Sequence, residues 1–450
     1  MSIPEAKESR EAAQRGAGAA LLSPPRDAWI AIAGVVLLFA GHLFYGALSN
    51  DVALAMNIVA ALVLAAVLAS PRLREDLLRI RTLTTPAILF GLTVLVAVWT
   101  LTPWTPGGPH PVWAYVGIGP GAATLDKSAT TMEIVKLLGL ACIFLLGAAT
   151  AGRDERARFA VQLTLVAGVA LGLWALIGAA SGIIVQSSPR LEAHFLNANT
   201  AGTVFAMLLC LAVAEFTRRL QGGGRGLRGA LLPFAAVLTF AVCLLDTASR
   251  GAVLAFGVAL LTFMGLQLRS GRLKLSRAVL GVAAAVVLVS LAVAVAGDLL
   301  VDRFFASPDD SVARFDTWRA HWQAFLGSPL FGYGLGSAET VNKTLLTASN
   351  YEALWSIRGI LNVYLQWLEE AGIVGAAPMF LCIGTVIFLA LRGHAQRSRM
   401  TGLIAGLIAA DVVVLVHGAT DFGLEVFSVA AFWSWLLGLQ FSLAQGSSRR

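Results

Sequence analysis

Apolar runs of about twenty residues recur along this chain, and they constrain its fold more than any other feature. A helix needs roughly 20 apolar residues to cross the hydrocarbon core of a bilayer. Only 13% of the 450 residues are charged, whereas a soluble domain carries about 25%. The sequence therefore predicts an all-α, polytopic transmembrane protein of about twelve spans. The runs lie near residues 28–47, 52–70, 86–103, 132–150, 159–182, 196–216, 229–245, 251–268, 278–297, 363–391, 401–420 and 425–444.

Arginine and lysine gather in every second connection between these runs, which is typical of cytoplasmic loops. We therefore predict that both termini are cytoplasmic. The net charge of +7 is explained by these loop clusters, so no nucleic-acid partner is expected. The inner clusters are Arg72, Arg74, Arg79 and Arg81; Arg153, Arg156 and Arg158; Arg218, Arg219, Arg225 and Arg228; Arg269, Arg272, Lys274 and Arg277; and Arg392, Arg397 and Arg399.

The same pattern divides the chain into five parts. Residues 1–27 lack the apolar core of a signal peptide and are predicted to form a disordered cytoplasmic tail. Residues 28–297 hold spans one to nine, 298–362 form a long outer loop, 363–444 hold spans ten to twelve, and 445–450 form a second tail. All four cysteines lie inside apolar runs, so neither a disulfide framework nor a cysteine zinc site is predicted.

The long outer loop contains an aromatic stripe at helical spacing. Arg319 lies on the opposite face, so we expect an amphipathic helix at the membrane surface. The glycine run Gly332–Gly336 follows no strand and is interpreted as a turn. Arg314 and His321 flank the stripe. The stripe consists of Phe315, Trp318, Trp322 and Phe325.

Two outer connections carry groups that suit an anion. Arg190, His194, Asn197 and Asn199 lead into the sixth span, and a helix N-terminus attracts negative charge. Helix capping is the alternative for the asparagines. Arg250 lies in a tight turn, where its planar fork of donors matches phosphate. Snorkelling to lipid phosphate is the alternative for Arg250.

Polar residues also enter the last three spans. Asn362, Gln366, Glu369 and Glu370 give the tenth span a polar face, which indicates either a cavity or hydrogen bonds between helices. Asp411 lies inside the eleventh span and is a functional candidate by position.

A histidine and an aspartate, His417 and Asp421, stand one helical turn apart where the eleventh span ends. At this spacing each side chain could orient the other. A structural role is the alternative for the histidine.

Taken together, these motifs resemble the O-antigen ligase and O-antigen polymerase family of bacterial membrane enzymes. The stretches that carry the resemblance are HFLNANTAG, TASRGAVLA, RFDTWRAHWQAFLGSPLFGYGLG, LNVYLQWLEEAGIVG and VHGATDFGLEV. They occur in the family's order over roughly residues 130–440. The resemblance implies a protein of the bacterial inner membrane with its active face in the periplasm.

The resemblance also implies a chemistry, which is glycan transfer from an undecaprenyl-diphosphate-linked donor to an acceptor hydroxyl on a glycan or on the lipid A core. No cofactor, nucleotide sugar or obligatory metal is implied. The partners would be these substrates, membrane lipid and the machinery of polysaccharide assembly. The family's outward arginines correspond to Arg250 and Arg314, which would hold the diphosphate, with Arg190 as a third candidate. Arg319, Asn197, Asn199 and Asn362 are the further substrate-binding candidates.

One position departs from the family's pattern. The family commonly has a histidine, proposed as general base, directly before the asparagine of the tenth-span motif, and this chain has Leu361 before Asn362. His194, His321 and Glu370 are the candidates to replace that base. If no residue replaces the base, activation of the leaving group by the arginines would account for most of the rate enhancement. A general base contributes about 10²–10⁴-fold, so its absence need not abolish transfer.

The sequence thus predicts a periplasm-facing glycosyltransferase of the O-antigen ligase or polymerase type. A flippase or exporter of lipid-linked glycan is one alternative. A relative that binds glycan lipid without catalysis is another, because Leu361 cannot accept a proton.

Overall fold

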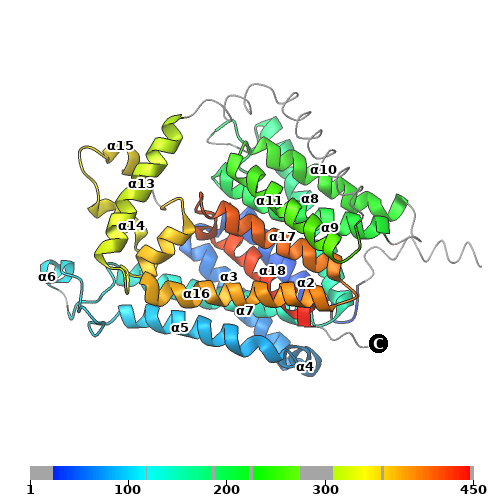
Figure 1. Ribbon diagram of the computed structural model, residues 1–450, viewed down its shortest axis with the longest axis horizontal. Helices are drawn as coiled ribbons and strands as arrows, with labels where there is room; N and C mark the ends of the chain where they lie inside the picture. Colours follow the sequence, from blue (N-terminus) through cyan, green and yellow to red (C-terminus); the bar gives the residue numbers. More distant parts are fainter. Residues whose placement is uncertain are drawn as a thin grey trace, which may run out of the picture.

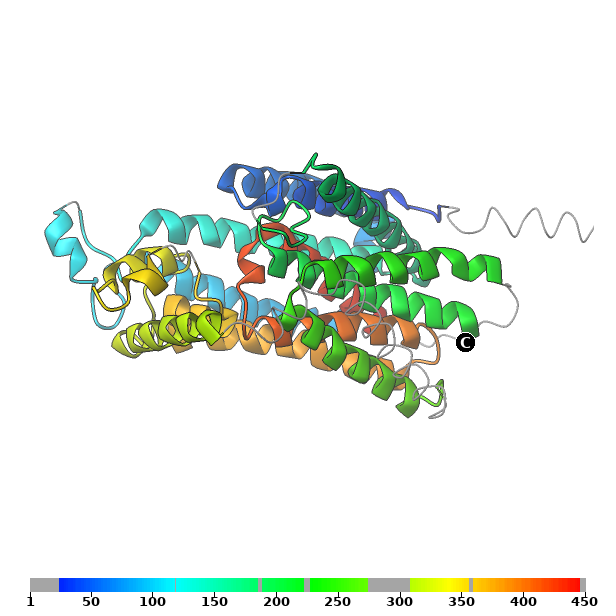
Figure 2. The ribbon, with the colours of Figure 1, turned by 90° about the horizontal axis from the view of Figure 1, so that it is seen from above.

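The computed structural model describes residues 24–117, 119–184, 188–221, 227–273, 308–355 and 359–445. Within these ranges the regular secondary structure is helical, as the sequence predicts. Figure 1 and Figure 2 show an elongated bundle whose long helices run along one direction. The long helices are α2 (Trp29–Leu43), α3 (Asn50–Ala69), α5 (Thr84–Thr100), α7 (Lys127–Thr150), α8 (Asp154–Ser181), α9 (Ala198–Gln221), α10 (Leu231–Asp246), α11 (Arg250–Arg269), α16 (Val363–Gln396), α17 (Thr401–His417) and α18 (Phe427–Gln445).

Eleven of the expected apolar runs coincide with these helices. Seven are long and apolar enough to cross a membrane, and four are shorter apolar helices of 10–17 residues. The expected ninth run, 278–297, lies outside the described residues, as do most of the two predicted tails. The chain is thus an all-helical, polytopic membrane protein, and its count of twelve spans stays a prediction.

Helices α9 and α18 form the centre of the bundle. Burial covers 83% of the apolar window of α9 and 94% of that of α18, but only 28% of that of α16. Glycines allow α7 and α18 to approach closely, since a Cβ on Gly438 would lie 2.1 Å from the carbonyl oxygen of Phe144. Asp411 of α17 accepts hydrogen bonds from Trp433 and Gln440 of α18, at 2.9 and 2.7 Å. Its role in the structure is therefore to join two helices.

Ion pairs tie the helices together at the arginine-rich end of the bundle. Arg156 is buried and donates to Asp76 of α4 (Pro71–Leu78) at 2.8 Å. Arg397 donates to Asp154 at the start of α8, at 3.0 Å. These arginines, which the sequence assigns to inner loops, therefore also have a structural role.

Short helices extend the opposite end of the bundle. They are α6 (Val112–Val116), α13 (Pro308–Gly327), α14 (Ala338–Thr344) and α15 (Tyr351–Leu354), and Figure 1 shows them together at the left. Helix α13 packs against the first turns of α16. The expected aromatic stripe is divided between two environments, because Phe315 is 69% exposed while Phe325 is only 5% exposed. Part of the stripe therefore packs on protein, and the position of this helix at the membrane surface stays a prediction.

Helix α16 is broken at Gly372, where φ is 61° and ψ is 179°. The break leaves backbone groups without helical partners, and these must be satisfied elsewhere when water is absent. The segment 329–334 satisfies them: Ile373 N–H donates to Pro329 at 2.9 Å, and Gly334 N–H donates to the Glu370 carbonyl at 2.8 Å. The predicted turn at Gly332–Gly336 is thus present, with positive φ at Gly332, Gly334 and Gly336, and its backbone is also hydrogen-bonded to α16.

Candidate active site

Three loops that start helices lie at the junction between the bundle and its extended end. They precede α9, α11 and α16. Each contains residues with positive φ other than glycine, a conformation that costs about 1–2 kcal/mol per residue and clusters at functional sites. The residues with positive φ in these loops are Ala193, His194 and Leu196; Ala248; and Leu361.

A chain of hydrogen bonds links the first two loops to the segment between α17 and α18. Arg190 donates through Nε to the carbonyl of Thr247 at 2.8 Å and through Nη2 to Asn199 Oδ1 at 2.7 Å. Asn199 Nδ2 in turn donates to Asp421 Oδ1 at 3.4 Å. Arg190 and Asn199 are therefore brought together with Asp421, which is separated from Asn199 by 222 residues.

The segment 417–421 also contacts the other two predicted arginine regions. Arg314 Nη1 donates to the carbonyl of Thr420 at 2.8 Å. Gly251, next to Arg250, lies so close that a Cβ there would be 2.8 Å from His417 Nε2 and 3.2 Å from Thr420 Oγ1. The structure thus gathers the neighbourhoods of Arg190, Arg250 and Arg314 around one short segment.

The third loop lies alongside the same segment. Val363 N–H donates to the carbonyl of Gly418 at 2.8 Å, and a Cβ on Gly359 would lie 3.4 Å from Phe422 Cβ. Leu361, with φ of 55°, therefore sits between two contacts with the loop that carries Asp421. The backbone at position 361 keeps a left-handed conformation in which histidine is more frequent than leucine.

Asp421 is the acidic member of this cluster. It is 1% exposed, and its Oδ2 atom has no hydrogen-bond partner among the described residues. Burial raises the pKa of Asp421 above the usual value of a carboxyl group, against the opposing effects of His417, Arg314, the hydrogen bond from Asn199 and the backbone N–H of Gly423. His417 is oriented by Thr203, whose Oγ1 lies 2.7 Å from the ring Nδ1 atom.

Helix N-termini add positive potential to the same place. Ser249 caps α11 by accepting from Ala252 N–H, and Arg250 is the first residue of that helix. Asn197 accepts from the N–H groups of Asn199 and Thr200 at the start of α9. Asn197 therefore acts as a helix cap, the alternative that the sequence left open. Both helix starts favour an anion near Arg250 and Asn199.

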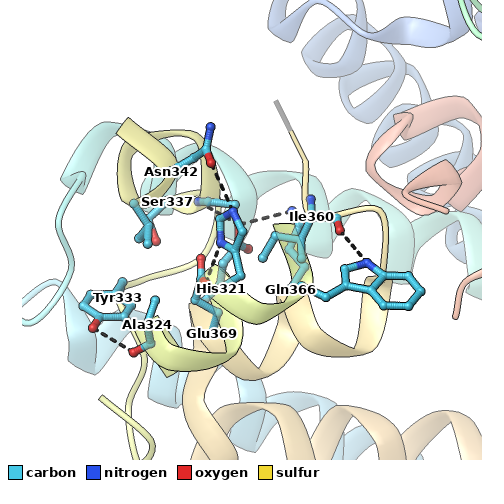
Figure 3. A network of polar contacts seen from close by, with 12 residues as sticks. His321, Ala324, Tyr333, Ser337, Asn342, Ile360, Gln366 and Glu369 are labelled. Atoms are coloured by element: carbon cyan, nitrogen blue, oxygen red, sulfur yellow. Dashed lines mark hydrogen bonds and ion pairs between the residues drawn. The ribbon is translucent and has the colours of Figure 1, made fainter. Parts of the chain in front are cut away.

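Two of the predicted base candidates belong to the scaffold next to this cluster. Figure 3 shows His321 between Glu369 and Asn342, with Nδ1 2.7 Å from Glu369 Oε2 and Nε2 3.2 Å from Asn342 Oδ1. The carboxylate of Glu370 accepts from Gly336 N–H at 2.9 Å and from Ala338 N–H at 3.1 Å. Both side chains thus hold the segment after α13 against α16.

The third base candidate, His194, faces a different neighbour. Trp174 of α8 donates its indole N–H to His194 Nε2 at 3.0 Å. Burial lowers the pKa of His194, so the ring is neutral at pH 7.

Beside the arginine cluster, an open groove of about 650 Å³ separates α13 from the first turns of α16. Arg319 lines one wall and Asn362 the other. Asn362 also caps α16 by accepting from Leu365 N–H at 3.0 Å.

Sequence reasoning named Asp421 only as a partner of His417 and not as a site residue, and it did not name Thr420. The available signal was the segment VHGATDFGLEV, which supplies His417, Thr420 and Asp421 together.

Comparison with known families supports one of the classes that the sequence motifs indicate. Residues 234–380 match the family model described as O-antigen ligase. This segment is an O-antigen ligase domain. It contains Arg250, Arg314, Leu361 and Asn362, and the match supports the family that the sequence motifs indicate. Comparison with curated proteins finds no match. The chain is thus a helical membrane protein, and the match over residues 234–380 supports an O-antigen ligase-type function in general.

Proposed function

We propose that this protein is a periplasm-facing glycosyltransferase of the bacterial inner membrane. It transfers or polymerises glycan from an undecaprenyl-diphosphate-linked donor onto an acceptor hydroxyl in the biosynthesis of cell-surface polysaccharide. The observation that carries this proposal is that three separate segments meet at the loop 417–421: Arg314 donates to Thr420 directly, Arg190 is linked to Asp421 through Asn199, and Gly251, next to Arg250, packs against His417 and Thr420. The basic residues at the other end of the bundle support a cytoplasmic placement for that end.

The arginines act on the leaving group. As the acceptor oxygen attacks the anomeric carbon, the bond from that carbon to the diphosphate oxygen breaks and negative charge grows on the diphosphate. Fixed cationic donors and the N-termini of α9 and α11 stabilise this charge more than they stabilise the bound donor. Such interactions, stronger in the transition state, are the ones that raise the rate.

The acceptor proton goes to Asp421 in this proposal. Asp421 Oδ2 is buried and makes no hydrogen bond by geometry in the described residues, although the Gly423 backbone lies close to the carboxyl group, and the neighbouring segment 359–363 contains the position where the family commonly has histidine. His321 and Glu370 are less suited, because their polar atoms bind Asn342, Glu369, Gly336 and Ala338. Asp421 thus offers a base where Leu361 cannot.

The test uses the purified protein in proteoliposomes with the lipid-linked glycan extracted from the source bacterium and a candidate acceptor. We expect covalent glycan transfer, and we expect Arg250→Ala and Arg314→Ala to reduce it by about 10²-fold or more. Arg79→Ala is the matched control, because Arg79 is exposed and pairs only with Glu75 of its own helix turn in the described residues. Donor movement across the vesicle without any covalent product would instead identify an exporter.

A further inference from the structure

The groove between α13 and α16 has a mixed lining. Aromatic rings from Phe315, Trp318 and Trp322 line the α13 side. Phe315 is 69% exposed and Trp322 45% exposed, so their faces are accessible to a ligand. Trp318 is held in place because its indole N–H donates to the carbonyl of Ile360 at 3.1 Å.

The polar members of the lining narrow the class of ligand. Asp316 and Arg319 bring charges of opposite sign, and Asn362 brings an amide. A hydrocarbon chain would make no hydrogen bonds with these groups, and an anion attracted by Arg319 would be repelled by Asp316. A polyhydroxyl ligand satisfies all of them, because hydroxyls both donate and accept hydrogen bonds. The C–H faces of sugar rings also pack against exposed aromatic faces.

The direction of the groove connects it to the arginine cluster. Arg314 directly precedes Phe315, while Trp318 and Trp322 follow one and two helical turns later. At a rise of 1.5 Å per residue, the ring-lined wall extends about 12 Å along α13 from Arg314. The ring-lined wall thus begins one residue after Arg314 along α13.

We propose that this groove binds the glycan of the lipid-linked donor, over the sugars that follow the diphosphate. This inference rests on the proposed function. It assigns Phe315, Trp318 and Trp322 to ring stacking, and Asp316, Arg319 and Asn362 to hydrogen bonds with sugar hydroxyls. The groove would thus select the donor by its glycan, while the arginines recognise only the diphosphate that donors share.

The experiment compares the binding of two lipids to the purified full chain. One is undecaprenyl diphosphate alone, and the other is the glycan-bearing lipid extracted from the source bacterium. We expect Trp322→Ala and Phe315→Ala each to weaken binding of the glycan-bearing lipid by about three- to tenfold and to leave binding of the bare lipid unchanged. Trp322→Phe should retain most of the affinity. Trp104→Ala is the control, because Trp104 is exposed and lies outside the groove.

Each outcome decides the proposal. Equal weakening of both lipids would assign the groove to the polyprenyl chain and overturn it, and unchanged binding in both variants would do the same. A rise in the acceptor KM with normal donor binding would assign the groove to the acceptor and also overturn it. Wild-type protein that binds neither lipid would instead contradict the proposed function itself. Arg314→Ala, which should weaken both lipids, distinguishes the two failures.

Discussion

Asp421→Asn is the most direct perturbation of the proposed chemistry. The change keeps the shape of the side chain and removes its ability to accept a proton. Because general-base assistance contributes about 10²–10⁴-fold, we expect glycan transfer to fall by that factor. The assay is the initial rate of transfer in proteoliposomes at saturating donor and acceptor, so that a change in binding does not enter.

The pH dependence of the same rate provides a second test. Burial raises the pKa of Asp421, so transfer should decline on the acidic side at a pH above that of an ordinary aspartate. The Asn variant should lose this acidic decline. If it keeps the wild-type pH profile, or a rate within about tenfold of wild type, Asp421 is not the base.

Stability should respond in the opposite sense from activity. A carboxyl group whose pKa is higher in the folded state contributes stability that is fully present below its unfolded pKa and is lost as the pH rises through its folded pKa. The ionised Asp421 carboxylate therefore lowers the free energy of unfolding at neutral pH. We expect the Asn variant to unfold at the same temperature as wild type or at a higher one, which separates lost catalysis from lost folding.

Three further predictions concern the scaffold and its missing histidine. Leu361→His, added to the Asp421→Asn variant, should restore much of the glycan transfer, because the backbone at 361 already has a conformation that suits histidine. A double variant as slow as Asp421→Asn alone would refute this. Gly372→Ala should destabilise the protein by about 1–3 kcal/mol in thermal unfolding, since φ is 61° and the new Cβ would lie 2.2 Å from the Leu330 carbonyl oxygen, whereas Gly384→Ala in the same helix, where nothing lies within 4 Å, should not. Asp76→Ala should cost about 3 kcal/mol, because it removes the carboxylate 2.8 Å from the buried Arg156 and leaves only that of Asp27, at 4.0 Å; an unchanged unfolding temperature would show that Asp27 and the backbone carbonyls near Arg156 suffice.

The helices could be predicted from the sequence because the length and apolar composition of each run are enough to indicate a membrane-spanning helix. The run at 196–216 lies within the buried helix α9, for example. The break at Gly372 could not be predicted in this way. The residues on both sides of it form one apolar run, and the groups that satisfy the opened backbone lie about forty residues earlier, at 329–334.

The candidate site was only partly predictable for a related reason. Arg250 and Arg314 stand out because arginine is costly near the outer end of a span. His321 and Glu370 stand out equally, yet their hydrogen bonds are taken by Glu369, Asn342 and backbone amides. Chemistry suggests which side chains could react, but only the fold determines which of them are already occupied.

The strip of chain paired with the opened turn of α16 has a mechanical consequence. Backbone hydrogen bonds join residues 329–334 to residues 369–374, and Tyr333 donates its hydroxyl to the Ala324 carbonyl on α13 at 2.9 Å. Helix α13 and the first half of α16 are therefore held together as one unit, here called the arm. The arm carries Arg314 at one end and both walls of the groove. Because both walls belong to the same arm, a movement of the arm against α17 would leave the width of the groove unchanged and would alter only the contacts of Arg314 and Val363 with the loop 417–421.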